Sequence, residues 1–455
     1  MIALKEKIKT WMGPLWWYSA VMFCVGRFGD VINLYTGLWL VPQWVPREEL
    51  GALLPLGQIG GLLGLPLAIL LMPITKFLNT FGAQGEYGKV KALLCDALFL
   101  TSVSAILVAG YTWCAAPFVF ERLRISGTAL VWLLCGIAVS SAFLPILNNG
   151  LQALKLFRCM STVGLVSAPV RLVFLWLLLP FFGLLGFFSS QFLFNVTIIG
   201  VSLLGLRKVL SRGVVRSSYW SHRNEMFRYT LPVAVLMAVT SLTVTAQLLV
   251  IRQRLPEVES AAYYFCSRFA EIPNILWSAV AVVFFPLVSE AFETGKDTRK
   301  ILLQVLVFTV GGGALVAISL GFAIGWLFGL VPKWHDYQPY AYLVGWIAMT
   351  NVFRVAWTCF AHHEMACRRF GFVGYSVFIA LIEAGLLVSL TGYGFFVPYV
   401  SDVWIDWMAS LKAARLEFIV WVMFASSSAV FCAIILQIIV KCFREKRQST
   451  LLSHD

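Results

Sequence analysis

Long apolar runs separated by short polar stretches recur along the whole chain. A helix needs about 20 mostly apolar residues to cross a membrane, and these runs have that length or more. They predict about twelve membrane-spanning helices, placed at 14–41, 55–79, 92–114, 128–150, 162–182, 184–207, 228–251, 261–289, 301–330, 338–361, 371–391 and 416–441. The fifth and sixth runs are divided only by the segment from Pro180 to Gly186, so we expect a tight hairpin there.

The fold class predicted by this pattern is all-α, a polytopic membrane bundle. A basic central loop, 207–228, has six runs before it and six after it, which predicts an N-terminal half at 1–215 and a C-terminal half at 216–455. The segment 45–52 also resembles the segment 255–262. Since both halves are expected to begin on the same side, the similarity indicates a parallel repeat. The alternative is a chance similarity between two apolar helices.

The composition agrees with a protein that uses lipid as its solvent. Hydrophobic residues make up 60% of the chain and charged residues only 13%, whereas a soluble domain carries about 25% charged residues. The net charge of +13 does not indicate nucleic-acid binding, because the basic residues lie in alternate loops rather than in one stripe. We therefore expect membrane lipids among the partners and no nucleic acid.

The alternation of basic loops predicts the orientation of the chain. Lysine and arginine gather before the first span, in the loops after the even-numbered spans and at the C-terminus. By the positive-inside rule these segments are cytoplasmic. We therefore expect a multi-pass protein of the inner (cytoplasmic) membrane with its N- and C-termini in the cytoplasm.

Charged residues inside the predicted spans are the candidates for function. Each costs about 2.5–3.5 kcal/mol at the helix centre on insertion scales, so it must face the bundle interior, a wet cavity or a partner of opposite charge. These residues are Arg27 and Asp30 in the first span, Arg171 in the fifth, Arg268 and Glu271 in the eighth, Arg354 in the tenth and Glu383 in the eleventh.

Two of these groups repeat one pattern: a cation, an anion and an amide, each three residues after the last. The groups are Arg27, Asp30 and Asn33, and Arg268, Glu271 and Asn274. With this spacing each group covers one broad face of its helix. Arginine suits an anionic ligand, because its planar fork matches phosphate oxygens and it keeps its charge. We predict that the arginines and asparagines bind an anionic substrate and that the acids orient the arginines or exchange a coupling ion.

A purely structural interpretation of the same residues remains open. Each triplet has the composition of an ion pair that only fixes helix packing. Arg171 either snorkels or pairs with a carboxylate. Arg354 and Glu383 together have the composition of a structural ion pair.

No motif in the sequence indicates catalysis or a cofactor. There is no Walker A loop, no Gly-x-Ser-x-Gly and no zinc motif, and the ten cysteines include no CxxC pair. We predict that His362, His363 and Glu364 form a polar loop at the inner end of the tenth span. We therefore expect no catalytic residue, no metal, no cofactor and no enzyme activity.

Three local motifs give the chain a resemblance to a known family. They are VPREELG at 45–51, YFCSR at 264–268 and FFPLVS at 284–289. In these, and in its two six-span halves, the chain resembles the multidrug/oligosaccharidyl-lipid/polysaccharide (MOP) superfamily, and within it the polysaccharide flippases. The resemblance implies two halves around a central cavity, and transport without a nucleotide site. It also implies arginines in the first and eighth spans for a lipid head group, where Arg27 and Arg268 stand.

The function that this resemblance implies is a transporter. It would flip or export a lipid-linked oligosaccharide or polysaccharide precursor by alternating access. The substrate would be an anionic polyprenyl-diphosphate-linked oligosaccharide, and polysaccharide synthesis enzymes would be further partners. Relatives that flip the peptidoglycan precursor have two more C-terminal spans, so an O-antigen, capsule or exopolysaccharide unit is expected instead.

Two alternatives belong to other classes. A multidrug or toxin cation antiporter of the same fold would favour unpaired acids in the cavity, whereas here each candidate acid of the two triplets has an arginine three residues away. A membrane glycosyl transferase or polymerase would need a substantial outer catalytic loop, which the sequence does not provide.

The predicted topology can be tested with single cysteines and an impermeant thiol reagent. Cysteines in place of Lys89 and Ser217 should react only from the cytoplasmic side. Cysteines in place of Glu48 and Lys333 should react from outside. Labelling of position 217 from outside would rule out two six-span halves that both begin in the cytoplasm.

Overall fold

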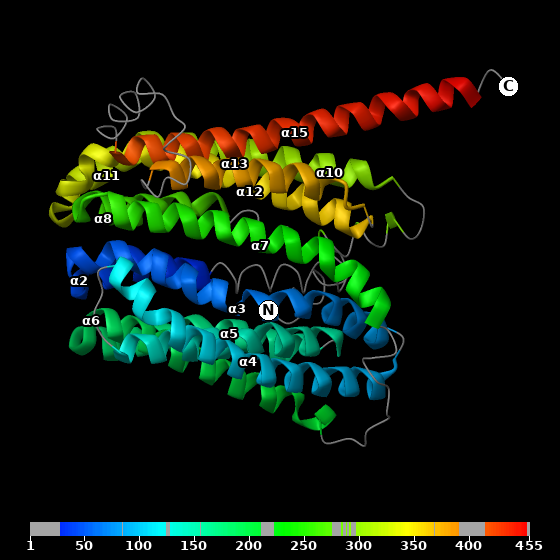
Figure 1. Ribbon diagram of the computed structural model, residues 1–455, viewed down its shortest axis with the longest axis horizontal. Coiled ribbons are helices and arrows are strands. Elements are labelled where there is room, and N and C mark those ends of the chain that lie inside the picture. The colour runs from blue at the N-terminus through cyan, green and yellow to red at the C-terminus, as the bar shows by residue number, and fades with distance from the viewer. Residues whose placement is uncertain are drawn as a thin grey trace, which may run out of the picture. The chain divides into compact units, whose positions relative to one another are not determined.

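A computed structural model describes most of the chain and is almost wholly helical (Figure 1). The described residues are 28–83, 85–123, 128–154, 156–210, 223–274, 284, 288, 291–292, 297–367, 369–390 and 415–452. Among them no strand occurs, and seven helices are long and apolar enough to cross a membrane. The all-α class of a polytopic membrane bundle is thereby confirmed.

The chain divides into two compact units, of which the first is Met1–Gln253. Its described elements are a helical segment at 28–35, η1 (Thr36–Leu40), α2 (Val41–Trp44), α3 (Arg47–Ala83), α4 (Tyr87–Leu123), α5 (Thr128–Ala153), α6 (Phe157–Leu210) and α7 (Arg223–Arg254). Helix α5 packs against α3, α4 and α6. Leu78, Leu94, Ile146 and Leu206 bring these four helices together in one buried core.

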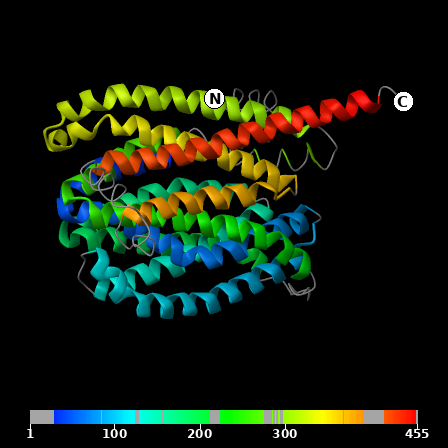
Figure 2. The ribbon, with the colours of Figure 1, turned by 45° about the horizontal axis from the view of Figure 1, so that its top comes forward.

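The second unit is Arg254–Asp455. It contains α8 (Glu257–Ala270), α10 (Thr298–Leu306), η3 (Val307–Gly311), α11 (Gly312–Leu330), η4 (Pro332–Tyr340), α12 (Leu343–Ala366), α13 (Phe372–Leu390) and α15 (Arg415–Leu452). Helix α12 contacts α8, α10, α11 and α15. Helix α15 runs along α12 and α13 and extends past them at its C-terminal end (Figures 1 and 2). The predicted boundary at 215/216 stays a prediction, because it lies outside the described residues.

Contacts between aromatic rings hold α12 and α15 together over much of their length. The ring centroids of Trp346 and Trp421 are 4.2 Å apart, and those of Phe353 and Phe431 are 5.0 Å apart. The two α12 residues are seven positions apart, which places them on one face of the helix. This seam fixes α12, which also contacts α8.

The predicted hairpin between the fifth and sixth spans is confirmed within α6. The apolar stretch from Thr162 to Arg207 has 46 residues, which as one straight helix would reach about 69 Å, more than twice the roughly 30 Å hydrocarbon core. At Gly183 the backbone leaves the helix, with φ +50° and ψ −123°. Glycine adopts this conformation readily because it has no Cβ. The chain therefore turns back at Gly183.

The two similar sequence segments also have similar local structures. A helix begins directly after Pro46 and another directly after Pro256. The carbonyl of each proline accepts the first helical hydrogen bond, from the N–H of Leu50 at 3.0 Å and of Ser260 at 2.9 Å. Proline suits this place because the first turn of a helix leaves its N–H groups unpaired anyway. The local structures support the internal repeat.

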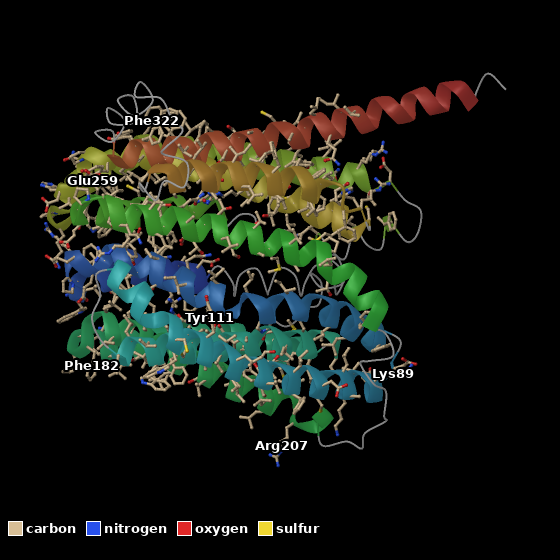
Figure 3. The ribbon with its side chains drawn as sticks, viewed as in Figure 1. Lys89, Tyr111, Phe182, Arg207, Glu259 and Phe322 are labelled. Atoms are coloured by element: carbon tan, nitrogen blue, oxygen red, sulfur yellow. The ribbon has the colours of Figure 1, made fainter. Side chains whose placement is uncertain are left out.

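The ends of the first unit agree with the predicted sidedness of its loops. Phe182, beside the hairpin turn, lies at one end of the unit, whereas Lys89 and Arg207 lie towards the other (Figure 3). The positive-inside pattern also put these two basic residues on one side. Which end faces the cytoplasm stays a prediction.

The hairpin predicts an asymmetry between two glycines of α6. A Cβ on Gly186 would lie 2.8 Å from the carbonyl carbon of Leu178, whereas a Cβ on Gly200 would have nothing within 4 Å. We expect Gly186→Ala to cost about 1–3 kcal/mol, because rigid backbone would have to move. Gly200→Ala should instead gain about 0.5–1 kcal/mol from higher helix propensity. Thermal unfolding in detergent measures both; equal midpoints would contradict the hairpin geometry.

Candidate functional site

Helix α8 owes its limits to two prolines. Pro256 lies just before its first residue, and Glu257 and Glu259 in the first turn match the positive end of the helix dipole. Pro273, three residues after the last residue of the helix, has no N–H with which to continue it. The eighth span is therefore interrupted close to its charged residues.

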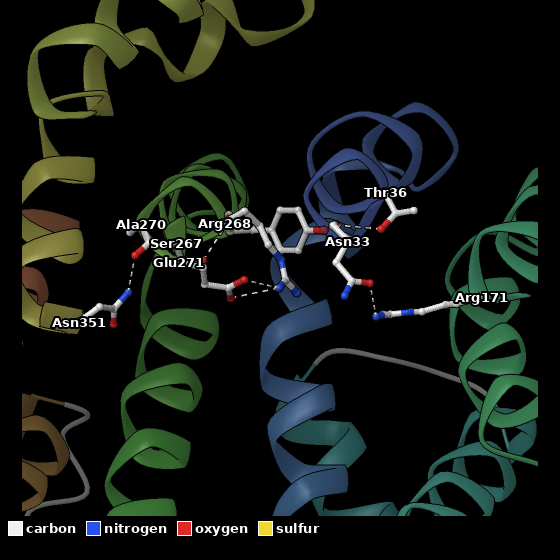
Figure 4. Close-up of polar contacts among 9 residues, drawn as sticks. Asn33, Thr36, Arg171, Ser267, Arg268, Ala270, Glu271 and Asn351 are labelled. Carbon is white, nitrogen blue, oxygen red and sulfur yellow. Dashed lines mark hydrogen bonds and ion pairs between the residues drawn. The ribbon is translucent and has the colours of Figure 1, made fainter. Parts of the chain in front are cut away.

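A side chain from another helix stabilises this interruption. The N–H of Asn274 donates to the carbonyl of Glu271 at 2.9 Å, and so does not reach back to Ala270 as it would in an α-helix. The carbonyl of Ala270 accepts a hydrogen bond from the side-chain amide of Asn351, on α12, at 2.8 Å (Figure 4). At membrane depth a backbone carbonyl that lacks its helical donor needs such a partner. Asn351 thus holds the break in place.

Arg268 and Glu271 lie at this break and bind each other. Nη1 of Arg268 donates to both carboxylate oxygens of Glu271, at 3.0 and 3.1 Å (Figure 4). The guanidinium carbon also lies 5.3 Å from the centroid of the Tyr264 ring, within the range of a cation–π interaction. The side chains of Arg268 and Glu271 are 26% and 44% exposed. The pair is therefore within reach of a ligand.

Two polar atoms beside the break have no hydrogen-bond partner among the described residues. They are Nε of Arg268, a donor, and Oδ1 of Asn274, an acceptor, and both atoms are buried. Buried polar groups in folded proteins are nearly always hydrogen-bonded. The eighth span thus has binding capacity that its described neighbours do not use.

A second Arg–Glu pair lies in the same unit. Nη2 of Arg354, on α12, is 3.6 Å from Oε1 of Glu383, on α13. The Glu383 side chain is 8% exposed and that of Arg354 is 32% exposed. The carboxylate is therefore enclosed, whereas the guanidinium still meets its surroundings.

The first unit has a polar group of its own. Nη1 of Arg171, on α6, donates to Oδ1 of Asn33 at 2.9 Å, and the hydroxyl of Thr36 donates to the carbonyl of Asn33 (Figure 4). Thr36 begins η1, a π-helical turn of the kind often found at functional sites. Asp30 is half-buried and also has interactions within the structure. Arg27 lies outside the described residues.

The structure thus gathers the predicted residues into separate local groups. Arg171 contacts Asn33, one of the predicted substrate-binding residues, and whether it also snorkels or pairs with a carboxylate stays a prediction. The charge pattern did not single out Tyr264 and Asn351, because both are uncharged. The only sequence signal for a break that needs a partner was Pro273, directly after a charged apolar helix.

A buried polar chain in the first unit was also missed. The side chain of Gln191 donates to Asn195, and Asn195 donates to Ser140, both at 3.0 Å. These bonds join α5 to α6, as polar side chains commonly do between helices in membranes. No charge marks them, so spacing alone could not single them out.

The prediction of a polar loop at His362, His363 and Glu364 was wrong. These residues belong to α12, and His363 and Glu364 are buried, 3% and 2% exposed. Nδ1 of His363 is 3.3 Å from Glu364, and its Nε2 is 3.1 Å from the hydroxyl of Thr298. These partners explain why such polar residues tolerate burial. Among the described residues no group of histidine, cysteine, aspartate or glutamate is arranged to hold a metal.

Aromatic side chains fix the other side of α8. Phe265 lies 4.5 Å from Tyr337 of η4, and Phe269 lies 5.8 Å from Trp334 of η4, between ring centroids. Phe328 of α11 packs against both Phe269 and Trp334. Aromatic rings of η4 and α11 and the side chain of Asn351 thus hold α8 in position. The position of Arg268 on this helix is fixed by the same contacts.

Neither a protein-family model nor a curated protein sequence matches the chain. Solved structures do match. A MOP superfamily transporter from Pyrococcus furiosus Vc1, whose binding pocket is described as having reverse polarity that suggests a different function, aligns with a TM-score of 0.63 at 14% identity, over 93% of this chain and 94% of that one.

Two structures of multidrug resistance MATE family transporters of the MOP superfamily match as well. The inward-facing one has a TM-score of 0.60 at 14% identity, over 93% of this chain and 98% of that one. The outward-facing one has a TM-score of 0.62 at 13% identity, over 94% and 95%. These likenesses show that the chain has the fold of MOP superfamily transporters, that of a multi-pass membrane protein.

The support that Asn351 gives to α8 predicts a stability difference. Asn351→Ala should cost about 1–3 kcal/mol, because it leaves the Ala270 carbonyl without its donor. Thr358→Ala is the matched control on the same helix. Its hydroxyl bonds the Arg354 carbonyl one turn back, a bond of slight structural value. Thermal unfolding in detergent should separate the two variants; equal midpoints would show that the cap does not stabilise the break.

Proposed function

We propose that the chain is a membrane transporter that moves an anionic, lipid-linked oligosaccharide across the cytoplasmic membrane by alternating access. The observation that carries this proposal is the charge arrangement of the second unit. Of its described acids, only Glu271 and Glu383 lie away from the ends of the spans, and both are already engaged by arginine. Among the described residues, Nε of Arg268 is a guanidinium donor without a hydrogen-bond partner.

Arg268 is suited to an anionic head group. Only Nη1 of its guanidinium donates to Glu271, and its buried Nε has no partner among the described residues. A guanidinium presents five N–H donors in a rigid fork, so it can bind more than one phosphate oxygen. Polyprenyl diphosphate offers several such oxygens.

The energetics support a functional role for this arginine. An ion pair three residues apart on one helix is worth about 0.2–0.5 kcal/mol in water, whereas an arginine at the centre of a span costs about 2.5–3.5 kcal/mol on insertion scales. The ion pair alone therefore does not offset the insertion cost of Arg268. A negatively charged ligand bound to Arg268 would add the missing stabilisation.

A cation antiporter is the second candidate, and the fold likeness favours it. Two of the similar structures are multidrug resistance transporters. A cationic substrate, however, would have to displace an arginine from Glu271 or Glu383. The Pyrococcus furiosus protein is described as having a pocket of reverse polarity, which supports the view that this fold also accommodates the opposite charge.

The remaining parts of the proposal follow from the predicted topology. Both termini lie in the cytoplasm, and the substrate enters from the inner leaflet. Arg27, Asn33, Asn274 and Arg171 add to the binding of the head group, and enzymes of polysaccharide synthesis supply the substrate. The sequence resemblance to polysaccharide flippases supports the cytoplasmic termini, the lipid-linked substrate and the role of Arg27, whereas Arg171, Asn33 and Asn274 are proposed from their positions in the spans.

Substitution of Arg268 tests the proposed function. In proteoliposomes with a fluorescent polyprenyl-diphosphate oligosaccharide, Arg268→Ala should reduce flipping at least tenfold, because the phosphate loses a bidentate partner. Arg268→Lys should recover part of the rate, since a lysine keeps the charge but not the fork. Size-exclusion profiles and thermal midpoints near those of the wild type would exclude misfolding as the cause.

A parallel assay with ethidium, a cationic dye, separates the two candidates. The proposed flippase should not export ethidium at a rate that depends on Glu271 or Glu383. Export of the dye that is lost in Glu271→Gln, together with no flipping of the anionic lipid, would establish the cation antiporter instead.

A further inference from the structure

The carboxylate of Glu271 and an anionic ligand at Arg268 would compete for one guanidinium. Both carboxylate oxygens of Glu271 accept from the same atom, Nη1 of Arg268, at 3.0 and 3.1 Å. A phosphate bound to that guanidinium would bring a second negative charge within a few ångströms of the carboxylate. Two anions so close, away from bulk water, do not both stay ionised at little cost.

The other charged groups of the unit are poorly placed to relieve this repulsion. The elements packed against α8 are η4, α11, α12 and α15. Helix α11 has no titratable residue. In α12, Arg354 is paired with Glu383 of α13. In α15, Glu417 accepts from the Tyr342 hydroxyl at 2.7 Å.

Among the described residues, the tyrosines and the polar residues of η4 have other contacts or are exposed. The Tyr263 hydroxyl on α8 points to Met423 Sδ of α15, at 4.0 Å. His335 of η4 bonds the Gly329 carbonyl, and Tyr337 packs on Phe265. The remaining titratable residues of η4 are Lys333, Asp336 and Tyr340, and the first two of these are exposed.

We propose that Glu271 takes up one proton from water when an anionic head group binds Arg268, so that substrate and proton bind together. The proton forms an O–H bond on the carboxyl group, and the guanidinium keeps its own proton throughout. The phosphate then takes the hydrogen bonds of Nη1 that Glu271 gives up. Glu271 is thus a proton site of the transporter, and this inference rests on the proposed function.

The sign of this coupling follows from linkage. If anion binding raises the affinity of Glu271 for a proton, a proton raises the affinity for the anion by the same factor. The substrate therefore binds more tightly as the pH falls. A cationic substrate would have the opposite effect, because it would compete with the proton for Glu271.

The experiment uses the full chain in phosphatidylcholine nanodiscs and farnesyl diphosphate as the probe. Calorimetry in buffers of different ionisation enthalpy counts the protons taken up on binding. We expect about one more proton in the wild type than in Glu271→Gln at the same pH, a difference that cancels the titration of the probe itself. As the pH falls, the affinity of the wild type for farnesyl diphosphate should rise relative to that of Glu271→Gln. One linked proton gives a rise of up to about tenfold for each pH unit.

The control is Glu86→Gln, which alters another ion pair between residues three positions apart, Glu86 and Lys89. Glu86 binds Lys89 at 2.8 Å near the end of the first unit and has no place in the candidate site. On binding farnesyl diphosphate, the Glu86→Gln variant should take up as many protons as the wild type. Glu271→Asp should also retain the uptake, since it keeps a carboxylate.

The outcomes separate the inference from the proposed function. Equal proton uptake by the wild type and Glu271→Gln, with binding that still needs Arg268, would overturn the inference and leave the flippase in place. At a pH where the probe is already fully ionised, wild-type binding without proton uptake would overturn it without any variant, even if Glu271→Gln failed to fold. No binding of farnesyl diphosphate, with ethidium binding that releases protons, would overturn both.

Discussion

Lipid offers no hydrogen bonds and little screening, so every charge or free carbonyl within a span must find a partner inside the protein. The second unit meets this constraint at the broken end of α8. Arg268 binds Glu271 and lies against Tyr264, while the Ala270 carbonyl receives its hydrogen bond from Asn351. The same constraint explains the enclosed Glu383 beside Arg354 and the buried His363 beside Thr298. These polar groups thus have partners inside the protein, whereas Nε of Arg268 and Oδ1 of Asn274 have none among the described residues.

Much of the fold is predictable from the sequence, because span length and turn residues depend on local chemistry. The hairpin between Pro180 and Gly186 illustrates this: only a glycine at 183 adopts the required backbone without strain. The spacing of Arg268 and Glu271 likewise predicts their contact, since residues three apart on a helix are neighbours. Helix bounds were less predictable, because α3 and α15 continue beyond the apolar runs that indicate them.

The rest of the site depends on contacts between residues far apart in the sequence. Nothing local to Asn351 indicates that it bonds a carbonyl 81 residues earlier, and nothing local to Asn33 indicates Arg171 as its partner. The error at His363 and Glu364 has the same origin. Polar residues at the end of a span look like a loop until Thr298, on another helix, supplies a partner that makes burial tolerable.

The bond between Asn351 and Ala270 has a consequence for how such sequences evolve. Pro273 breaks the helix, and Asn351 supplies the hydrogen bond that the Ala270 carbonyl would accept from the N–H of Asn274 in a regular helix. A chain that lost the proline would regain a regular helix, and the amide at 351 would then be left without its acceptor. Positions 273 and 351 should therefore covary among relatives, with asparagine or another donor retained only where the proline is. Such covariation would make the break in the eighth span recognisable from aligned sequences alone.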